Sequence, residues 1–400
     1  MNGWEVKKLS EVCQVDKSQG IHKNLPYVGM ENIESNTARF IGSTEPQSVK
    51  SASFSFTTKH LLYGRLRPYL NKVIAPEFEG HCSTELFPIK PSKCLDRNFL
   101  LYWFLMDSTV RLINATCTGA RMPRANMNTV LEFEFLLPPL SEQKRIVAIV
   151  DEAFEGIDRA IANTQKNLTN ARELFESYLN AIFTQKGDGW VEKQLGDIAE
   201  LIDSLHKTPS YIDEGGFPMV RVTDIKDGAL NLKNARRVDE ATFIEFSKRH
   251  SPKIGDIVFS RVGSYGVPAL VQSDELFCLG QNTVFIIPRI NSQLLYFFLR
   301  SPNSQEQIEK FVAGTTQGTI SLKSIKQIRV PIPPDSAQPG LAATLTSVLI
   351  EAHRLEAIYK QKLAAFNELK QSILQKAFTG ELTADTTNQA TKTAKEVIAA

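Results

Sequence analysis

The stretch GWVEKQLGDIAE, residues 189–200, lies near the middle of the chain but reads like the beginning of a domain. The chain itself starts with MNGWEVKKLSEV, in which Trp4 occupies the position of Trp190. Leu9 matches Leu195 in the same Gly-Trp-x-x-x-x-Leu pattern. This agreement indicates that the chain repeats its own beginning about halfway through its 400 residues.

The repetition continues in the same order along both halves of the chain. The matching segments, front half first, are LPYVGMENI (25–33) with FPMVRVTDI (217–225), LLYGR (61–65) with IVFSR (257–261), FLLYWFL (99–105) with QLLYFFL (293–299), FEFLLPPL (133–140) with IRVPIPPD (328–335), and LNAIFT (179–184) with LQKAFT (374–379). Their spacing drifts by only a few residues, as expected for copies that differ by small loop insertions. A period close to half of the chain length indicates tandem duplication of one large unit, because solenoid repeats are far shorter.

The front part of each copy reads as a mixture of short strands and turns. Apolar stretches such as HLLYGRL (60–66) and GDIVFSRV (255–262) are separated by Gly, Pro and Ser, which is typical of strands joined by tight connections. Helices are expected within this part at residues 98–113 and 292–312.

The back part of each copy carries one long amphipathic pattern. A double proline precedes it, and because proline fixes φ and biases its predecessor to extended backbone, a helix can begin only afterwards. Apolar residues then recur at spacings of three and four, which predicts helices over 141–186 and 336–383. An apolar pattern of about 43 residues makes a helix of about 65 Å, so its apolar stripe needs a partner helix. The helix of the other copy is the obvious partner.

The predicted fold class is α+β. We expect two tandem mixed α/β domains joined by two long helices, which pair as an antiparallel coiled coil and give a dumbbell with pseudo-two-fold symmetry. The expected parts are a first domain (1–140), a first helix (141–186), a second domain (187–335), a second helix (336–383) and a disordered tail (384–400). The Trp and Leu of each repeated pattern are then expected to be buried anchors at the helix ends.

Composition places the chain among globular proteins and argues against several other classes. Apolar residues make up 42% and charged residues 22%, and no apolar run approaches the roughly 18–20 residues of a membrane span. Glu5 and Glu11 interrupt the N-terminus, so no signal peptide is expected. The five cysteines are scattered and never form a C-x-x-C pair, which favours a reducing cytoplasm over a disulfide framework or a zinc site.

The sequence contains no motif for catalysis or for a bound cofactor. G-x-G-x-x-G, G-x-x-x-x-G-K-[ST] and H-E-x-x-H are all missing, and the six histidines share no metal-ligand spacing. Neither double proline follows the Asn or Asp that an amino-methyltransferase places against its target base. We therefore expect neither enzymatic activity nor a metal in this chain.

Basic and polar side chains gather in corresponding loops of both copies. The net charge is only +2, so a nucleic-acid ligand would require positive charge concentrated in loops or on one face. Arg, Asn and Gln can fork onto guanine and adenine edges, whereas Lys, Ser and Thr suit phosphates. The candidate DNA-binding residues are Arg65, Arg67, Tyr69, Lys72, Arg121, Arg124 and Asn126 in the first copy, and Arg261, Ser264, Tyr265, Gln281, Asn282, Thr316, Gln317 and Lys323 in the second.

Taken singly, any of these arginines is as readily explained as an ion-paired surface residue. The hypothesis of DNA binding depends on their distribution, because corresponding loops in both copies are enriched in these types yet differ in detail. Two related domains that read two different DNA sequences would show this pattern.

Over essentially its whole length, the sequence resembles the specificity subunits of type I restriction-modification systems. The segments that carry the resemblance are GWEVKKLSEV and GWVEKQLGDIAE as domain openings, LLYGRLRPYLNKV, GDIVFSRVGSYG, TGARMPRANMNTVLEFEFLLPPLSEQKRIV, GTTQGTISLKSIKQIRVPIPP and LKQSILQKAFTGEL. Each segment is weakly diagnostic by itself, but their order and their duplication are highly specific.

The resemblance implies two target-recognition domains, each binding one half of an asymmetric, bipartite site in double-stranded DNA, with the helices setting the gap. It implies that this chain is not an enzyme and binds no cofactor directly. The implied partners are two modification (methyltransferase) subunits, which dock on the helices and use S-adenosylmethionine, and restriction subunits, which use ATP and Mg²⁺. No membrane partner is implied, and the expected location is cytoplasmic.

The second copy departs from the first at the start of its long helix. PPLSEQKRIV in the first copy becomes PPDSAQPGLAATL in the second, so Pro339-Gly340 replaces the charged pair Lys144-Arg145. This difference weakens the expectation that the two modification subunits make identical contacts.

Two other functions stay open on the sequence alone. One is a duplicated coiled-coil scaffold that binds proteins without recognising DNA, and the other is an enzyme with an unrecognised site. The Arg, Asn and Gln content of the loops favours DNA recognition over the scaffold. Methyl transfer or DNA cleavage by the isolated chain would be needed to favour the enzyme.

Overall fold

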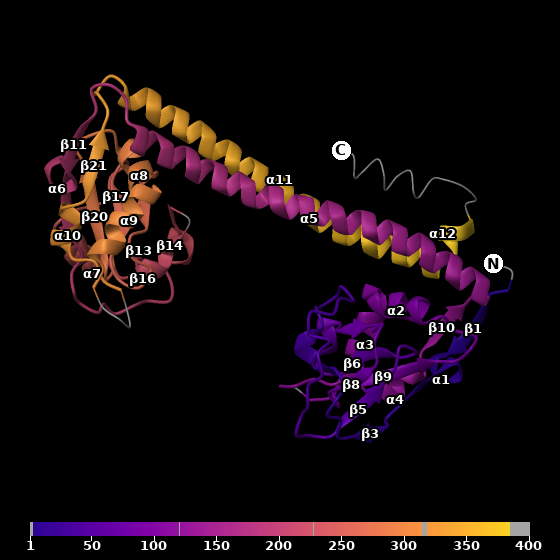
Figure 1. Ribbon diagram of the computed structural model, residues 1–400. Helices are drawn as coiled ribbons and strands as arrows, with labels where there is room; N and C mark the ends of the chain where they lie inside the picture. The colour runs from indigo at the N-terminus through magenta and orange to yellow at the C-terminus, as the bar shows by residue number, and fades with distance from the viewer. Residues whose placement is uncertain (1–2, 120, 227, 314–317, 385–400) are drawn as a thin grey trace. The chain divides into compact units, whose positions relative to one another are not determined.

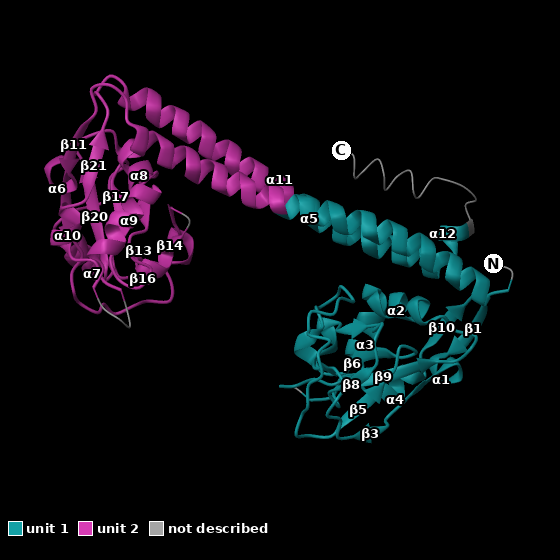
Figure 2. Ribbon diagram, in the orientation of Figure 1, with its two compact units in different colours: residues 1–165, 361–400 teal, residues 166–360 magenta. Residues whose placement is uncertain are grey.

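The chain forms two compact units (Figure 2), and the computed structural model describes residues 3–119, 121–226, 228–313 and 318–384. Unit 1 combines residues 1–165 with residues 361–400, and unit 2 comprises residues 166–360. Each unit therefore contains one mixed α/β head and a part of each of two long helices. The tail expected over 384–400 lies outside the described residues, apart from Ala384.

The two long helices run antiparallel, as the sequence predicts. They are α5 (Leu140–Gln185) and α11 (Gln338–Phe378) (Figure 1). In unit 1 the N-terminal part of α5 packs against the C-terminal part of α11, where Asp158 pairs with Lys370. In unit 2 the C-terminal part of α5 packs against the N-terminal part of α11, where Arg172 Nη2 lies 3.1 Å from Glu356 Oε2.

The starts of the long helices follow from the prolines before them. Helix α5 begins directly after Pro139, whose carbonyl accepts the first helical hydrogen bonds. Helix α11 begins two residues later than expected, because a turn closed by the hydrogen bond from Ala337 N to Pro334 O (2.8 Å) precedes it. Pro339 is tolerated in the first turn of α11, where its missing N–H needs no helical partner.

The second long helix also ends earlier than expected. Helix α11 stops at Phe378, and Gly380 follows with a φ of +78°, a left-handed conformation that glycine adopts without steric cost. The short helix α12 (Glu381–Ala384) comes after this break.

The first head contains two four-stranded sheets, ordered β2-β9-β6-β7 and β3-β5-β8-β4, and the antiparallel pair β1·β10 that leads into α5. Its strands are β1 (Glu5–Lys8), β2 (Cys13–Val15), β3 (Gln19–Gly20), β4 (Tyr27–Val28), β5 (Ser53–Phe56), β6 (Leu61–Gly64), β7 (Val73–Ile74), β8 (Gly80–Cys82), β9 (Leu86–Pro91) and β10 (Glu134–Leu137). Its helices are α1 (Leu9–Val12), α2 (Arg97–Leu105), α3 (Asp107–Ala115) and α4 (Met127–Leu131), with 3₁₀ turns η1 (Met30–Asn32) and η2 (Pro68–Leu70).

The second head contains the sheets β12-β20-β17-β18 and β16-β13-β19, the hairpin β14·β15, and the pair β11·β21 before α11. Its strands are β11 (Val191–Gln194), β12 (Ala199–Asp203), β13 (Phe217–Val220), β14 (Ile225–Lys226), β15 (Ala229–Leu230), β16 (Arg236–Val238), β17 (Ile257–Ser260), β18 (Pro268–Leu270), β19 (Cys278–Leu279), β20 (Thr283–Pro288) and β21 (Arg329–Ile332). Its helices are α6 (Leu195–Ile198), α7 (Glu240–Ser247), α8 (Ser292–Arg300), α9 (Pro302–Phe311) and α10 (Leu322–Lys326), with 3₁₀ turns η3 (Val222–Asp224) and η4 (Leu232–Asn234).

The two heads share the frame that the sequence repeat predicts. The sheet β2-β9-β6-β7 has its counterpart in β12-β20-β17-β18, and the parallel pair β4·β8 has its counterpart in β13·β19. The helices expected near 98–113 and 292–312 are present as the pairs α2–α3 and α8–α9. These findings confirm an α+β fold with two mixed domains and two packed antiparallel helices.

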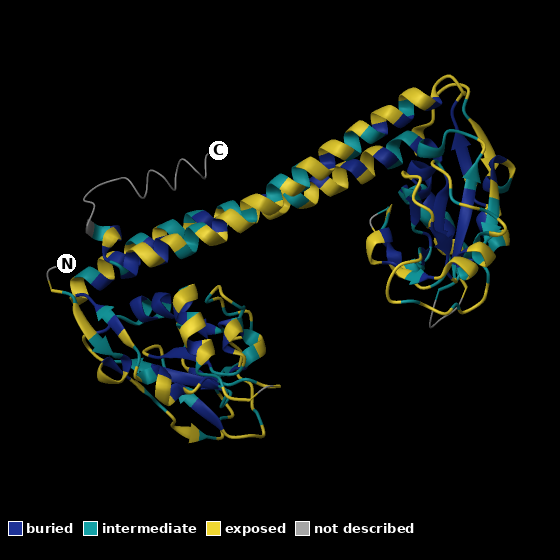
Figure 3. Cartoon of the chain, turned by 180° about the vertical axis from the view of Figure 1, so that it is seen from behind, coloured by how far each residue is buried: buried dark blue, intermediate teal, exposed yellow. Residues whose placement is uncertain are grey.

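Buried residues lie in the interior of each head and along the contact between the long helices (Figure 3). The side chains that make up these cores are apolar. Leu9 and Leu195 are buried, as expected. Trp4 and Trp190 are only half-buried, although both pack against the core of their unit. Trp190 meets the edge of the Phe183 ring on α5, with 6.3 Å between the ring centroids. Trp190 therefore joins the second head to the end of α5 at the surface of the core.

None of the helices over the described ranges, from residue 3 to residue 384 with the gaps given above, is both long enough and apolar enough to span a membrane.

Candidate nucleic-acid interface

Two backbone segments of the first head lie side by side and carry most of its candidate residues. One segment follows β6 (65–72) and the other is a hairpin (118–124); together we call them the first loop pair. Arg67 N donates to Pro123 O (2.7 Å), and Thr118 and Arg124 exchange hydrogen bonds at 3.2 Å across the hairpin. Backbone hydrogen bonds therefore hold the two segments next to each other.

The second head holds the corresponding segments together in the same way. Its second loop pair consists of 261–267 and 313–319. Gly263 N donates to Gly318 O (3.0 Å), and Ala313 and Thr319 exchange hydrogen bonds across the hairpin. The candidates Thr316 and Gln317 lie outside the described residues.

A carboxylate joins the two segments of the first loop pair. Glu85 lies directly before β9 and accepts hydrogen bonds from Arg65 Nε (3.0 Å) and from Arg124 Nε and Nη2 (3.0 and 2.8 Å, both to Oε1). Burial alone would raise the pKa of Glu85, but the hydrogen bonds and charges of Arg124 and Arg65 lower it overall. The Arg65 guanidinium also lies 5.1 Å from the Phe87 ring centroid. Both arginines are thus already engaged inside the protein.

The remaining candidates of the first head divide into two groups. Arg67, Tyr69 and Arg121 expose their side chains on the first loop pair. Lys72 turns inward, because its Nζ donates to the carbonyl of Met30 (2.6 Å). Asn126 caps α4 by accepting from the backbone N of two residues of that helix.

An ion pair of different design holds the second loop pair. Arg261 donates from Nη1 to Asp203 Oδ1 (2.6 Å) and from Nε to the carbonyl of Ile320 (3.2 Å). Its side chain is only 13% exposed, which leaves little of it to meet a ligand. Asp203 ends β12, so this carboxylate comes from a different strand than the one that Glu85 precedes.

The other candidates of the second head do not all meet. The ring of Tyr265 lies against Gly318, where a Cβ would come within 2.4 Å of it, and Lys323 is exposed on α10. Ser264, Gln281 and Asn282 do come together, at the edge of a pocket of about 370 Å³.

This pocket adds residues that the sequence analysis missed. Gln281 Nε2 donates to Thr208 Oγ1 (3.3 Å) across it, and the Arg236 guanidinium lies 4.8 Å from the centroid of the Tyr211 ring on its rim. Arg221 also lines the pocket and is paired with Asp224. Tyr211 and Arg236 are residue types that suit nucleic-acid contact, but they lie 25 residues apart in the sequence, so no local motif joins them.

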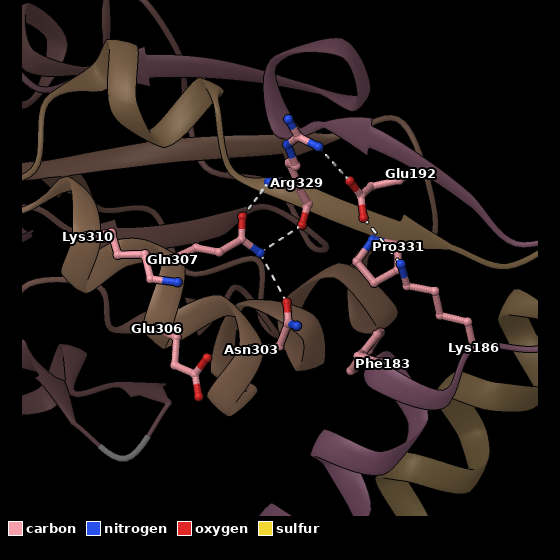
Figure 4. Close-up of a pocket in the computed structure, with 9 residues that line it drawn as sticks. All are labelled: Phe183, Lys186, Glu192, Asn303, Glu306, Gln307, Lys310, Arg329 and Pro331. Atoms are coloured by element: carbon pink, nitrogen blue, oxygen red, sulfur yellow. Dashed lines mark hydrogen bonds and ion pairs between the residues drawn. The ribbon is translucent and has the colours of Figure 1, made fainter.

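A second pocket of the same head, of about 380 Å³, is lined by the residues shown in Figure 4. Two of the three cations in its lining are already paired, because Lys186 and Arg329 both contact Glu192, at 3.3 and 3.2 Å. These cations lower the pKa of Glu192, Lys186 contributing most, against the opposing effect of burial. Gln307 is likewise engaged, with Asn303 and with the backbone of Arg329 (Figure 4). The loop pairs, and not this pocket, are therefore the candidate interface.

Within the part of the chain that the structure describes, no three His, Cys, Asp or Glu side chains are grouped so that they could hold a metal ion.

One protein-family model matches two parts of the chain. The family model described as type I restriction modification DNA specificity domain matches residues 1–170 and again residues 187–364. The two matches coincide with the two copies of the sequence repeat.

Curated relatives are similar at low identity. The EcoBI specificity subunit of Escherichia coli is 24% identical over 319 residues, which cover 72% of this chain and 66% of that subunit. The EcoKI specificity subunit of Escherichia coli strain K12 is 25% identical over 326 residues, covering 74% and 68%. The chain thus spans about two thirds of the length of these relatives. The MjaIX specificity subunit of Methanocaldococcus jannaschii aligns over 95% of this chain and 93% of that subunit, at 21% identity.

Two solved structures share the fold. A chain from the type I R-M system, solved to explain its complex assembly and conformational transition, has a TM-score of 0.80 at 22% identity and covers 96% of this chain and 99% of its own. The HsdS subunit from Thermoanaerobacter tengcongensis has a TM-score of 0.58 at 20% identity, covering 95% and 98%.

Proposed function

This chain belongs to the family of type I restriction modification DNA specificity proteins, and from that premise we propose that each of its heads reads one half of a bipartite, asymmetric DNA site. The recognition domains are residues 1–140 and 187–335. The chain selects the target sequence and leaves methyl transfer and DNA cleavage to partner subunits.

The observation that carries this proposal is the repeated loop pair. Both heads hold it in the same backbone frame, yet the side chains it presents differ: Arg67, Tyr69 and Arg121 in the first head, and Ser264 with the adjoining Gln281 in the second. Base edges are distinguished by such side chains, whereas a common frame fixes where they stand. Two domains with the same backbone frame therefore recognise two different half-site sequences.

The long helices (141–186 and 336–383) act as the spacer between the two half-sites. An unbent helix of 46 residues, the length of α5, would span about 69 Å. Consecutive major grooves on one face of DNA are about 34–36 Å apart. A spacer of this length suits half-sites separated by unread bases.

Two modification subunits dock on the long helices and use S-adenosylmethionine, and restriction subunits that use ATP and Mg²⁺ join through this complex. The exposed pair Lys144-Arg145 at the start of α5 contrasts with Pro339-Gly340 at the start of α11. The two docking sites are therefore not identical. The complex acts on DNA in the cytoplasm, where the cysteines, all free in the structure, stay reduced.

Gel-shift binding with the purified modification subunits tests the proposal. A sequence-selective shift on a subset of genomic fragments is expected. A complex that assembles fully but shifts all fragments alike would favour the alternative function, a duplicated coiled-coil scaffold without DNA recognition.

A further inference from the structure

We propose that Glu85 in the first head and Asp203 in the second are positioning residues, which hold the loop pairs in their reading geometry through Arg65, Arg124 and Arg261. This inference rests on the proposed DNA recognition and assigns these three arginines a role inside the protein. The exposed side chains of the same loop pairs then contact the DNA bases.

The first carboxylate sits where it can connect both segments of its loop pair. Arg65 belongs to the segment after β6, and Arg124 closes the hairpin. Glu85 therefore accepts hydrogen bonds from one charged side chain in each segment. The side chain of Glu85 is 22% exposed, and partial burial strengthens charge-assisted hydrogen bonds. Removing the carboxylate leaves two like charges facing each other at the base of the hairpin.

In the second head, the carboxylate that pairs with the equivalent arginine comes from another strand. Arg65 and Arg261 are equivalent, because Arg65 N donates to the carbonyl of Glu85 (3.0 Å) just as Arg261 N donates to the carbonyl of Asn282 (2.9 Å). Asn282 therefore takes the place of Glu85 in the second copy and carries no charge. Asp203 supplies the missing carboxylate from the end of β12.

The two heads pair equivalent arginines with carboxylates that come from different positions of the repeat. Duplication alone would preserve the carboxylate at one position, but the two heads keep the arginine and change the source of its partner. The common element is an arginine after the central strand that is paired with a carboxylate. The link to the hairpin is Arg124 on Glu85 in the first head and the bond from Arg261 Nε to the carbonyl of Ile320 in the second. That element serves the geometry of the loops, whatever sequence each head reads.

The paired arginines are poorly placed to read bases. Bidentate recognition of guanine needs two N–H groups of one guanidinium. Arg124 already directs Nε and Nη2 at Glu85 and Nη1 at the carbonyl of Met122 (3.5 Å). Arg261 is almost enclosed. Arg67, Tyr69, Arg121 and Met122 instead project from the first loop pair, with Tyr69 50% and Met122 47% exposed.

The test compares single and double variants of the full chain, assembled with its modification subunits. Glu85→Ala, Arg124→Ala and the double variant are titrated against the native site and against sites altered at one base of either half. Glu79→Ala, an exposed glutamate of the same head, is the matched control. Thermal unfolding of each complex verifies folding.

If the carboxylate positions the loops, Glu85→Ala and Arg124→Ala each weaken recognition of the first half-site about tenfold or more, spread over all its bases. The double variant is no worse than Glu85→Ala alone, because removing the carboxylate already breaks its ion pair with Arg124. Binding at the second half-site is unchanged, and so is the salt dependence of affinity, since no phosphate contact is lost.

A direct base contact by Arg124 gives the opposite pattern. Glu85→Ala then leaves affinity unchanged or tightens it, because the arginine is released, and Arg124→Ala relaxes one base position only. Either result overturns the inference. Should Glu85→Ala not fold, Asp203→Asn makes the same comparison in the second head, with loss confined to the second half-site. A wild-type complex without any sequence selectivity would instead refute the proposed function itself.

Discussion

Gln143 and Gln338 share two equivalent hydrogen bonds at the starts of the two long helices. Gln143 Oε1 accepts from Asp96 N (2.7 Å), and Gln338 Oε1 accepts from Asn291 N (3.0 Å). The amide nitrogen of each donates to the carbonyl of the first residue of its double proline, at 2.8 and 3.2 Å. Each glutamine is buried, so a satisfied amide joins the helix pair of each head to its long helix.

Replacing this amide should destabilise the unit that contains it. Gln143→Leu leaves the buried Pro138 carbonyl and the partly buried Asp96 N–H and Cys94 carbonyl without their partner, and should lower the free energy of unfolding by about 2–4 kcal/mol. Denaturant unfolding measures the change, with Gln185→Leu at the exposed end of α5 as control. An equal effect of both substitutions would show that the buried amide is not the cause.

Shortening both helices together should change the gap between half-sites and leave the half-sites intact. Deleting residues 160–166 and 362–368 removes two turns from each helix and keeps the pairs Asp158–Lys370 and Arg172–Glu356 opposite one another. Seven residues correspond to about 10 Å, or about three base pairs. Methylome sequencing reads the new gap, and altered half-site sequences would contradict the spacer role.

Truncating an exposed arginine of the first loop pair should affect one half-site only. Arg121→Ala should cost about 1–3 kcal/mol of binding to the first half-site through loss of a base contact. Arg111→Ala, on the exposed face of α3, is the control and should bind as the wild type does. Equal loss at both half-sites would indicate a general phosphate contact or a folding defect.

Acid should weaken the contribution of Glu85 to stability. Its pKa in the folded protein lies below the ordinary value of 4.5, so its ion pairs stabilise the fold above that pH and are lost as the pH falls through the lowered pKa. The difference in melting temperature between wild type and Glu85→Gln should therefore shrink on acidification below 4.5. A difference independent of pH would contradict a charged role for this carboxylate.

The sequence predicts the parts of the fold that depend on periodicity. Patterns repeated in both copies predict the duplication and the antiparallel pairing of the long helices. They also predict the helices near 98–113 and 292–312. The end of α11 agrees with Gly380 as a helix stop, although the expected bound at residue 383 lies five residues beyond Phe378.

The candidate interface is predictable only in outline. The loops can be located, but whether an arginine is exposed or paired depends on carboxylates far away in sequence. Glu85 lies 20 residues from Arg65 and 39 from Arg124, and Asp203 lies 58 residues from Arg261. Only the folded sheets bring these groups together, so no local pattern distinguishes Arg124 from the exposed Arg121.

Single-molecule methylation sequencing of cells that carry this chain with its modification subunits tests the central claim most directly. Two heads with one spacer predict a single asymmetric motif, made of two defined half-sites separated by a fixed number of undefined bases. Exchanging residues 187–335 for the corresponding domain of a relative should then change one half-site and preserve the other. A contiguous motif, or a change in both halves after the exchange, would contradict the account.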